Sequence, residues 1–278
     1  MKRKSWELKL IFLVLVAVFA IFLAVPAIRL LLKSFLGEDG LTGAYYLDVF
    51  SGKGFTTALG NSFAVSIVSA LVAVGIAFVM AYIIHYTRLP RGFKRFVQAV
   101  ATLPMFLPTI TYGFAIIYSF GKQGLITRLL GHQLFDIYGF TGLLLGYVIY
   151  TLPVSFLLIH NTMGYIDKKF MVVSRIMGDG GRKTFWITII RPLLGTLAAS
   201  FVQCFFLSFT DFGIPASVGG QYEVVASVLY DEMLGSLPDF NNGAVVAMVM
   251  LVPSVVSILL LHYLERYNVR YSKISIVE

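Results

Sequence analysis

Long apolar runs separated by short charged segments dominate the pattern along this 278-residue chain. Six runs without Asp, Glu, Lys or Arg each extend over about 20 residues, the length with which a helix crosses the hydrocarbon core of a bilayer. Their apolar positions do not alternate with the period of two that barrel strands show. Because backbone amides in lipid must be satisfied within each segment, we expect membrane-spanning helices over about 10–32, 60–85, 96–120, 137–161, 192–214 and 240–264.

The composition agrees with this pattern. Hydrophobic residues make up 58% of the chain, charged residues 13%, and the mean hydropathy is +0.84, values that are typical of a polytopic membrane protein. The gaps between the runs leave no room for a large soluble domain, and no internal duplication is visible. We therefore predict an all-α membrane protein in which residues 1–278 form one transmembrane domain.

The distribution of positive charge predicts the orientation. With the N-terminus inside, 17 of the 22 Lys and Arg residues fall in cytoplasmic segments, as the positive-inside rule requires. Both termini are then cytoplasmic. The net charge of +8 is explained by these membrane-flanking loops, which argues against nucleic acid as a partner. The single cysteine, Cys204, lies inside the fifth run, where we interpret it as a small packing residue.

Prolines mark the places where the predicted helices change direction. Pro104 and Pro108 each remove a backbone donor from the third span, so we expect that helix to be bent or broken. Such a bend can serve packing alone or can line a solute path. Pro192 suits the first turn of a helix and predicts that the fifth span begins there. A short interfacial helix is expected around Tyr45–Phe50.

Several chemistries are absent from the sequence. No Gly-x-x-x-x-Gly-Lys-[Ser/Thr] motif occurs, so the chain is not expected to hydrolyse ATP or to be an enzyme. Its four histidines, His85, His132, His160 and His262, are scattered near the ends of the spans or in an outer loop, and nothing in the sequence predicts that they converge on a metal. An intramembrane serine protease would need a Ser and His pair at matched depth, which the spacing does not suggest.

Asp211 is the one acid at the end of an apolar run. An acid within the membrane is a functional hypothesis by default, whereas a carboxylate at a helix end can simply cap or be solvated. Both interpretations stay open. The candidate solute path consists of polar and proline positions in the third and fifth spans: Asp211, Gln203, Ser208, Tyr112, Pro104 and Pro108.

A basic, glycine-rich segment over about 164–191 separates the fourth and fifth runs. Its charge places it on the cytoplasmic side, where a soluble partner can bind it. A short helix that follows Gly178-Asp179-Gly180 would place Asp179 near the positive end of the helix dipole. Phe185 and Trp186 would then pack on a neighbour or anchor the helix at the membrane interface.

This segment resembles the cytoplasmic EAA loop of permease subunits of binding-protein-dependent ABC importers. The resemblance rests on Ser174-Arg-Ile-Met-Gly178, on Phe185-Trp186 and on Arg191-Pro192-Leu-Leu between the fourth and fifth spans. The chain has Val172-Val173-Ser174 where the family usually has Glu-Ala-Ala, so its contact with the partner is expected to differ in detail. The resemblance implies that eight residues couple the chain to an ATPase: Ser174, Arg175, Gly178, Asp179, Gly180, Phe185, Trp186 and Pro192.

Two further stretches are similar to the branch of the family that handles ferric iron, polyamines, thiamine and 2-aminoethylphosphonate. They are Leu103–Pro108 with the glycines that follow, and Phe209–Pro215 followed by Gly219-Gly220. The resemblance implies a type I importer permease fold in a bacterial cytoplasmic membrane, with lipid around it. It also implies three partners: two cytoplasmic ATPase subunits that carry ATP and Mg, a second permease subunit, and an extracytoplasmic solute-binding protein. This chain itself is expected to hold no cofactor.

The resemblance favours a small charged solute, with 2-aminoethylphosphonate or a related phosphonate first, ferric iron second and polyamine third. A phosphonate would be attracted by basic groups or helix N-termini, whereas iron or polyamine would favour acids such as Asp211. The rival class is an ion-coupled secondary transporter. That class predicts inverted repeats and paired intramembrane charges, neither of which is visible in the sequence.

Overall fold

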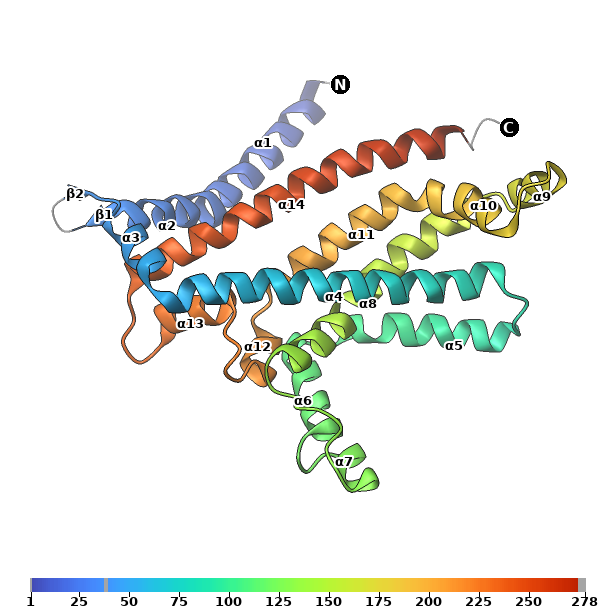
Figure 1. The fold of residues 1–278 in the computed structure, drawn as a ribbon. Coiled ribbons are helices and arrows are strands. Elements are labelled where there is room, and N and C mark those ends of the chain that lie inside the picture. Colours follow the sequence, from blue (N-terminus) through green and yellow to red (C-terminus); the bar gives the residue numbers. More distant parts are fainter. Residues whose placement is uncertain (1, 38–39, 275–278) are drawn as a thin grey trace. The chain divides into compact units, whose positions relative to one another are not determined.

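The computed structural model describes residues 2–37 and 40–274, and most of these residues are helical (Figure 1). The chain divides into two units. One is made of residues 1–56 and 228–251, and the other of residues 57–227 and 252–278. Three helices contribute residues to both units. They are the long helices α4 (Lys53–Tyr86) and α14 (Phe240–Ile274) and the shorter α13 (Val225–Leu234).

The first unit begins with the apolar N-terminal helix and a small ribbon. Its elements are α1 (Lys2–Phe19), the wide turn η1 (Ala20–Ala24), α2 (Val25–Phe35), β1 (Leu36–Gly37), β2 (Gly40–Leu41) and α3 (Ala44–Ser51). The two strands are antiparallel and pair Leu36 with Leu41. The Tyr46 ring stacks on Phe35 at 4.8 Å, and its hydroxyl lies 3.1 Å from that of Ser34. The short helix expected around residues 45–50 is therefore confirmed as α3.

The second unit holds most of the remaining helices. They are α5 (Arg91–Thr102), η2 (Leu103–Phe106), α6 (Thr109–Phe120), α7 (Leu125–Leu130), α8 (Phe140–Gly164), α9 (Lys169–Ile176), α10 (Gly181–Phe185), η3 (Trp186–Ile190), α11 (Arg191–Thr210) and α12 (Gly213–Val218).

Five helical stretches in the described residues are long and apolar enough to cross a membrane, and a bent pair supplies a sixth. The five are Trp6–Phe35, Gly54–Tyr86, Phe140–Gly164, Gly181–Thr210 and Phe240–Leu264. The prediction of an all-α membrane protein is confirmed. The third predicted span differs from the others because it is the bent pair.

The third span is broken at its two prolines. Residues Arg91–Phe106 and Thr109–Leu130 meet at 115°, and in Figure 1 α6 and α7 turn away from the line of α5. Leu107 and Pro108 are extended between them. The Tyr112 hydroxyl donates to the carbonyl oxygens of Pro104 and Leu107 and so bridges the break. The predicted bend is confirmed.

The α-helix α11 begins at Arg191 with Pro192 in its first turn, as expected, but further helical turns precede it. Helical turns continue without a break from Gly181 to Thr210. A wide π turn, η3, precedes the proline, and the Arg191 N–H donates to the Trp186 carbonyl five residues back. Proline has no backbone N–H, so it cannot donate the hydrogen bond of an ordinary helical turn. The π turn before Pro192 accommodates this missing bond. The same arrangement occurs at η1 before Pro26.

The core of the second unit is built from small residues on α4 and larger ones on α8 and α11. Ala77 and Ala81 of α4 are fully buried against Phe156, Ile159 and other residues of one cluster, which also includes Ala101, Met163, Ile189 and Leu193. Small residues let membrane helices approach closely. Cys204 is fully buried beside Ala70 and Ala73, as the packing interpretation predicted.

Candidate functional site

The segment between α8 and α11 folds into two short helices joined by a tight turn. At the end of α9, Gly178 has φ +85°. The Asp179 N–H donates to the Ser174 carbonyl at 3.1 Å, and the Gly178 N–H donates to the Arg175 carbonyl at 3.0 Å. This pair of bonds is a Schellman motif, in which glycine takes the left-handed position at the lowest cost. Gly178 therefore fixes the direction in which the chain leaves α9.

Side chains tie this turn to α10. The Ser174 hydroxyl donates to Asp179 Oδ2 at 2.8 Å and lies 3.1 Å from the Thr184 hydroxyl. Lys183 Nζ lies 2.6 Å from Asp179 Oδ1. Hydrogen bonds from Lys183 and then Ser174 lower the pKa of the Asp179 carboxyl. We call these four residues, Ser174, Asp179, Lys183 and Thr184, the loop knot.

The outer side of the same turn is apolar. Ile176 is 80% exposed and Met177 is 78% exposed, and Val172 and Val173 are exposed on the preceding helix. Ser174, in contrast, is buried. A cluster of large apolar side chains on a polar loop is typical of a surface that another protein covers. We call Ile176 and Met177 the apolar tip.

The aromatic pair that follows the loop is divided between two roles. The Phe185 ring meets Phe78 at 6.3 Å and Tyr82 at 5.8 Å, both edge-on, so it packs on α4. Trp186 remains 55% exposed. The sequence offered packing on a neighbour or contact with the membrane interface for both residues, and the structure gives them different surroundings. Phe185 anchors the loop to its own chain, and Trp186 is free to meet lipid or a partner.

The other predicted loop residues lie where the backbone requires them. Gly180 precedes α10, Arg175 is exposed, and Pro192 is half-buried within the continuous helix. Asp179 stands one residue before the position that caps α10, and its carboxylate bonds to Ser174 and Lys183. The fold thus brings the loop residues together, with Pro192 and Trp186 farther along the same helix.

The one carboxylate of the candidate solute path is already hydrogen-bonded within the chain. Asp211 is 8% exposed and follows the end of α11. Its Oδ2 accepts the Ile214 N–H at 2.9 Å, and the Thr109 hydroxyl and Gly213 N–H also bond to the carboxylate. The side chain therefore joins the start of α12 to the start of α6. Of the two interpretations from the sequence, this geometry favours capping.

Two more polar residues of the candidate path are satisfied inside the chain. The Ser208 hydroxyl accepts a hydrogen bond from Ser69 at 3.4 Å, and Tyr112 is bonded across the break. Gln203 differs, because its half-buried amide makes no hydrogen bond within the described part of the chain. Pro104 is half-buried and Pro108 is exposed.

Two histidines that the sequence did not predict to meet are in contact. His85 and His160 lie side by side, with His85 Nε2 at 3.0 Å from His160 Nδ1. They are 75 positions apart, and no local pattern marks them as partners. Among residues 2–37 and 40–274, no three His, Cys, Asp or Glu side chains gather as metal ligands.

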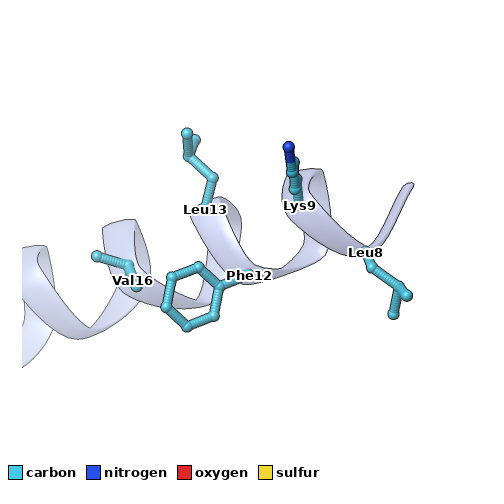
Figure 2. Close-up of a pocket in the computed structure, with 5 residues that line it drawn as sticks. All are labelled: Leu8, Lys9, Phe12, Leu13 and Val16. Carbon is cyan, nitrogen blue, oxygen red and sulfur yellow. The ribbon is translucent and has the colours of Figure 1, made fainter. Parts of the chain in front are cut away.

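A shallow hollow lies along α1 and is lined by Leu8, Lys9, Phe12, Leu13 and Val16 (Figure 2). All five residues come from one helix, and Figure 2 shows them spread along its side. Four of them are apolar, and the most apolar stretch of this helix buries none of its residues within the chain. Such a surface suits contact with lipid rather than a solute.

Comparisons with known proteins identify the family. Residues 73–269 match the family described as binding-protein-dependent transport system inner membrane component. The putative ferric transport system permease protein FbpB 1 of Haemophilus influenzae is 22% identical over 259 residues, which cover 91% of this chain but only 40% of that relative. The sulfate transport system permease protein CysT of Synechococcus elongatus is 24% identical, covering 96% of this chain and 93% of the relative.

The fold has a close match among solved structures. A chain from a bacterial ABC transporter involved in the import of the acidic polysaccharide alginate superposes with a TM-score of 0.80 at 14% identity, covering 95% of this chain and 96% of that one. The predicted type I importer permease fold is confirmed. The chain belongs to the family of binding-protein-dependent transport system inner membrane components, and it is a multi-pass protein of the cytoplasmic membrane.

Proposed function

We propose that this chain is the membrane-spanning permease subunit of an ATP-driven importer. It pairs with a second permease subunit, either another copy or a related chain. Two cytoplasmic ATPase subunits, which carry the ATP and Mg, drive the pair, and an extracytoplasmic binding protein delivers the solute. The chain is not itself an enzyme and holds no cofactor. Both of its termini lie in the cytoplasm, on the same side as the loop of residues 164–191.

The observation that carries this proposal is the geometry of the apolar tip. Ile176 and Met177 are almost fully exposed, yet the backbone that presents them is fixed by Gly178 and by the loop knot. Ordering a loop costs free energy, so a surface that is already ordered binds a partner with less to lose. Phe185 and the buried Ile189 join this loop to the helices of the core, so a displacement of the tip is transmitted to α4 and α11.

We further propose that the mechanism is alternating access. Closure of the ATPase pair on ATP draws the two loops together, and the helices that they are attached to open outward to accept the solute. Hydrolysis lets the ATPases separate and returns the permease to the inward-open arrangement. Solute then leaves on the cytoplasmic side.

The solute is proposed to be a small oxyanion, with 2-aminoethylphosphonate or a related phosphonate first. Asp211 does not favour a cation, because its carboxylate is buried and already accepts bonds from Ile214, Gly213 and Thr109 within the chain. The name of the sulfate relative agrees with an oxyanion. The name of the ferric relative favours ferric iron, which stays the second candidate, with polyamine third.

The test is to retrieve the tagged chain from its own membrane in mild detergent and to assay ATPase activity in the eluate. Gly178→Arg should reduce the recovered activity by at least tenfold, because an arginine at φ +85° is strained and distorts the tip. Gly131→Arg is the matched control. Gly131 also has a positive φ, of +76°, and a Cβ there meets nothing within 4 Å, as at Gly178.

Co-purification of an ATPase with wild type and Gly131→Arg, and its loss from Gly178→Arg, would support the importer. Solute screening with purified binding protein would then rank phosphonate, iron and polyamine. If the chain elutes alone and still moves solute down an ion gradient in vesicles, the secondary-transporter class replaces this proposal.

A further inference from the structure

A histidine pair connects the ends of α4 and α8 on the side of the unit where the loop knot lies. His85 Nε2 is 3.0 Å from His160 Nδ1 and 3.1 Å from the His160 carbonyl oxygen. The two ring centroids are 4.6 Å apart. Gly164 lies beside the pair, since a Cβ there would be 3.4 Å from His85 Cε1.

These distances assign the protons. A carbonyl oxygen only accepts, so the His85 Nε2 that faces it carries a hydrogen. The same N–H points at His160 Nδ1, which must therefore be unprotonated and accept as well. His85 can take a second proton on its other nitrogen and still donate. His160 cannot take one on Nδ1, because two N–H groups would then face each other at 3.0 Å.

The surroundings make a second positive charge more costly. His160 stacks on Phe156 at 5.1 Å. The charged groups that face the pair are two lysines, Lys94 of α5 and Lys168 just before α9. The Lys94 ammonium donates to the carbonyls of Ile84 and Thr87 at the end of α4, and Lys168 lies over the Tyr86 ring. Within the described part of the chain, no carboxylate acts on either ring.

We propose that the His85–His160 pair is a proton-sensitive joint between α4 and α8. With His160 neutral, the N–H of His85 holds the two helix ends together. Protonation of His160 on Nδ1 replaces that hydrogen bond with two opposed donors and releases the joint. Histidine changes its charge between about pH 5 and 8, and one added proton on His85 leaves the hydrogen bond in place, so acidification that protonates both rings is the stimulus that the joint detects.

The joint lies close to the start of the loop of residues 164–191, so its release affects that loop. His160 lies four positions before the last residue of α8, Gly164, and α9 begins five positions after it, at Lys169. Opening of the joint therefore loosens the base from which the loop of residues 164–191 projects. If the proposed importer function holds, an acidified cytoplasm lowers transport. The structural part of the inference does not depend on that function.

The test measures amide hydrogen exchange of the full-length chain in lipid nanodiscs at pH 7.5 and 5.5, corrected for the intrinsic effect of pH on exchange. Peptides that cover residues 83–87 and 160–166 should lose protection severalfold at pH 5.5 in the wild type. His160→Gln should remove this loss, because glutamine accepts from His85 but does not titrate. His132→Gln is the control, since His132 is exposed and distant in the sequence, and it should behave as the wild type.

A second variant guards against a folding defect in His160→Gln. In His85→Gln, the glutamine can turn its oxygen to accept from a protonated His160, so the acid response should again disappear. Unchanged protection of the wild type between the two pH values overturns the inference, as does an undiminished acid response in a folded His160→Gln. Uptake into vesicles with an acidified cytoplasmic side then tests the effect on transport separately, and a wild-type loss absent from His160→Gln is expected.

Discussion

The loop of residues 164–191 and the turn between α11 and α12 use polar side chains in opposite ways. In the loop, Ser174, Asp179 and Lys183 bond to one another and leave the apolar tip exposed. At the turn, Asp211 is buried and bonds to the backbone. In the proposed importer, the first arrangement presents a surface to a partner, whereas the second fixes broken helices in place. The difference is whether the polar side chains bond to one another beside an exposed apolar surface or to the backbone of a buried turn.

Charging the apolar tip should abolish the docking surface of the loop. Ile176→Asp combined with Met177→Asp places two carboxylates where the tip would be desolvated, and burying unpaired charges is costly. We expect ATPase recovery to fall by at least tenfold while the amount of chain in the membrane stays the same. Leu129→Asp, at a leucine that is 76% exposed on α7, controls for the charge. Normal recovery with the charged tip would remove its docking role.

Removing the Asp211 carboxylate should affect stability more than solute binding. Asp211→Ala leaves the Ile214 N–H buried without its acceptor, at a cost of about 1–3 kcal/mol. Thermal unfolding of the chain in detergent should shift to lower temperature, and the solute concentration for half-maximal uptake should stay constant. The neighbouring Thr210→Ala, at an exposed residue, should shift neither quantity. A changed solute requirement with unaltered stability would return Asp211 to the solute path.

The sequence predicted those features that depend on neighbouring residues. Apolar runs are long enough to predict the spans, and Pro104 with Pro108 predicted the break in the third one. Pro192 does lie in the first turn of α11, but the π turn before it extends the helical stretch back to Gly181, which the sequence did not predict. The His85–His160 contact and the bonds of Asp211 to Thr109 join residues far apart in the chain. Such contacts depend on how the helices pack, which local periodicity does not encode.

Crowding the contact between α6 and α12 should destabilise the chain by an amount similar to that of Asp211→Ala. A Cβ at Gly113 would lie 1.6 Å from the Ser217 hydroxyl oxygen, so Gly113→Ala pushes the two helices apart. Overpacking of this kind costs about 1–3 kcal/mol, which should appear as a lower unfolding temperature. Gly113→Ala with Ser217→Gly should recover most of the loss, because the clashing side chain is then absent. Failure of this rescue would show that the clash is not the cause.

The loop knot should respond to pH in a different range from the histidine joint. The pKa of Asp179 is lowered by Lys183 and Ser174, so its charged form is favoured in the folded loop. That contribution is present above the ordinary aspartate pKa of about 4 and is lost as the pH falls through the lower folded value. In His160→Gln, whose joint does not respond to acid, amide protection of residues 174–184 should therefore be equal at pH 7.5 and 5.5. Asp179→Asn should reduce it at both pH values, and Arg182→Gln should change neither.

Photo-crosslinking in native membranes shows whether the apolar tip touches an ATPase subunit, as the proposed function requires. A photoreactive amino acid is placed at Met177 and, as the control, at Leu129, which is exposed to a similar degree. We expect an adduct with an ATPase subunit from position 177 and none from position 129. An adduct from both positions, or from neither while position 177 reacts with lipid or with the chain itself, would contradict it.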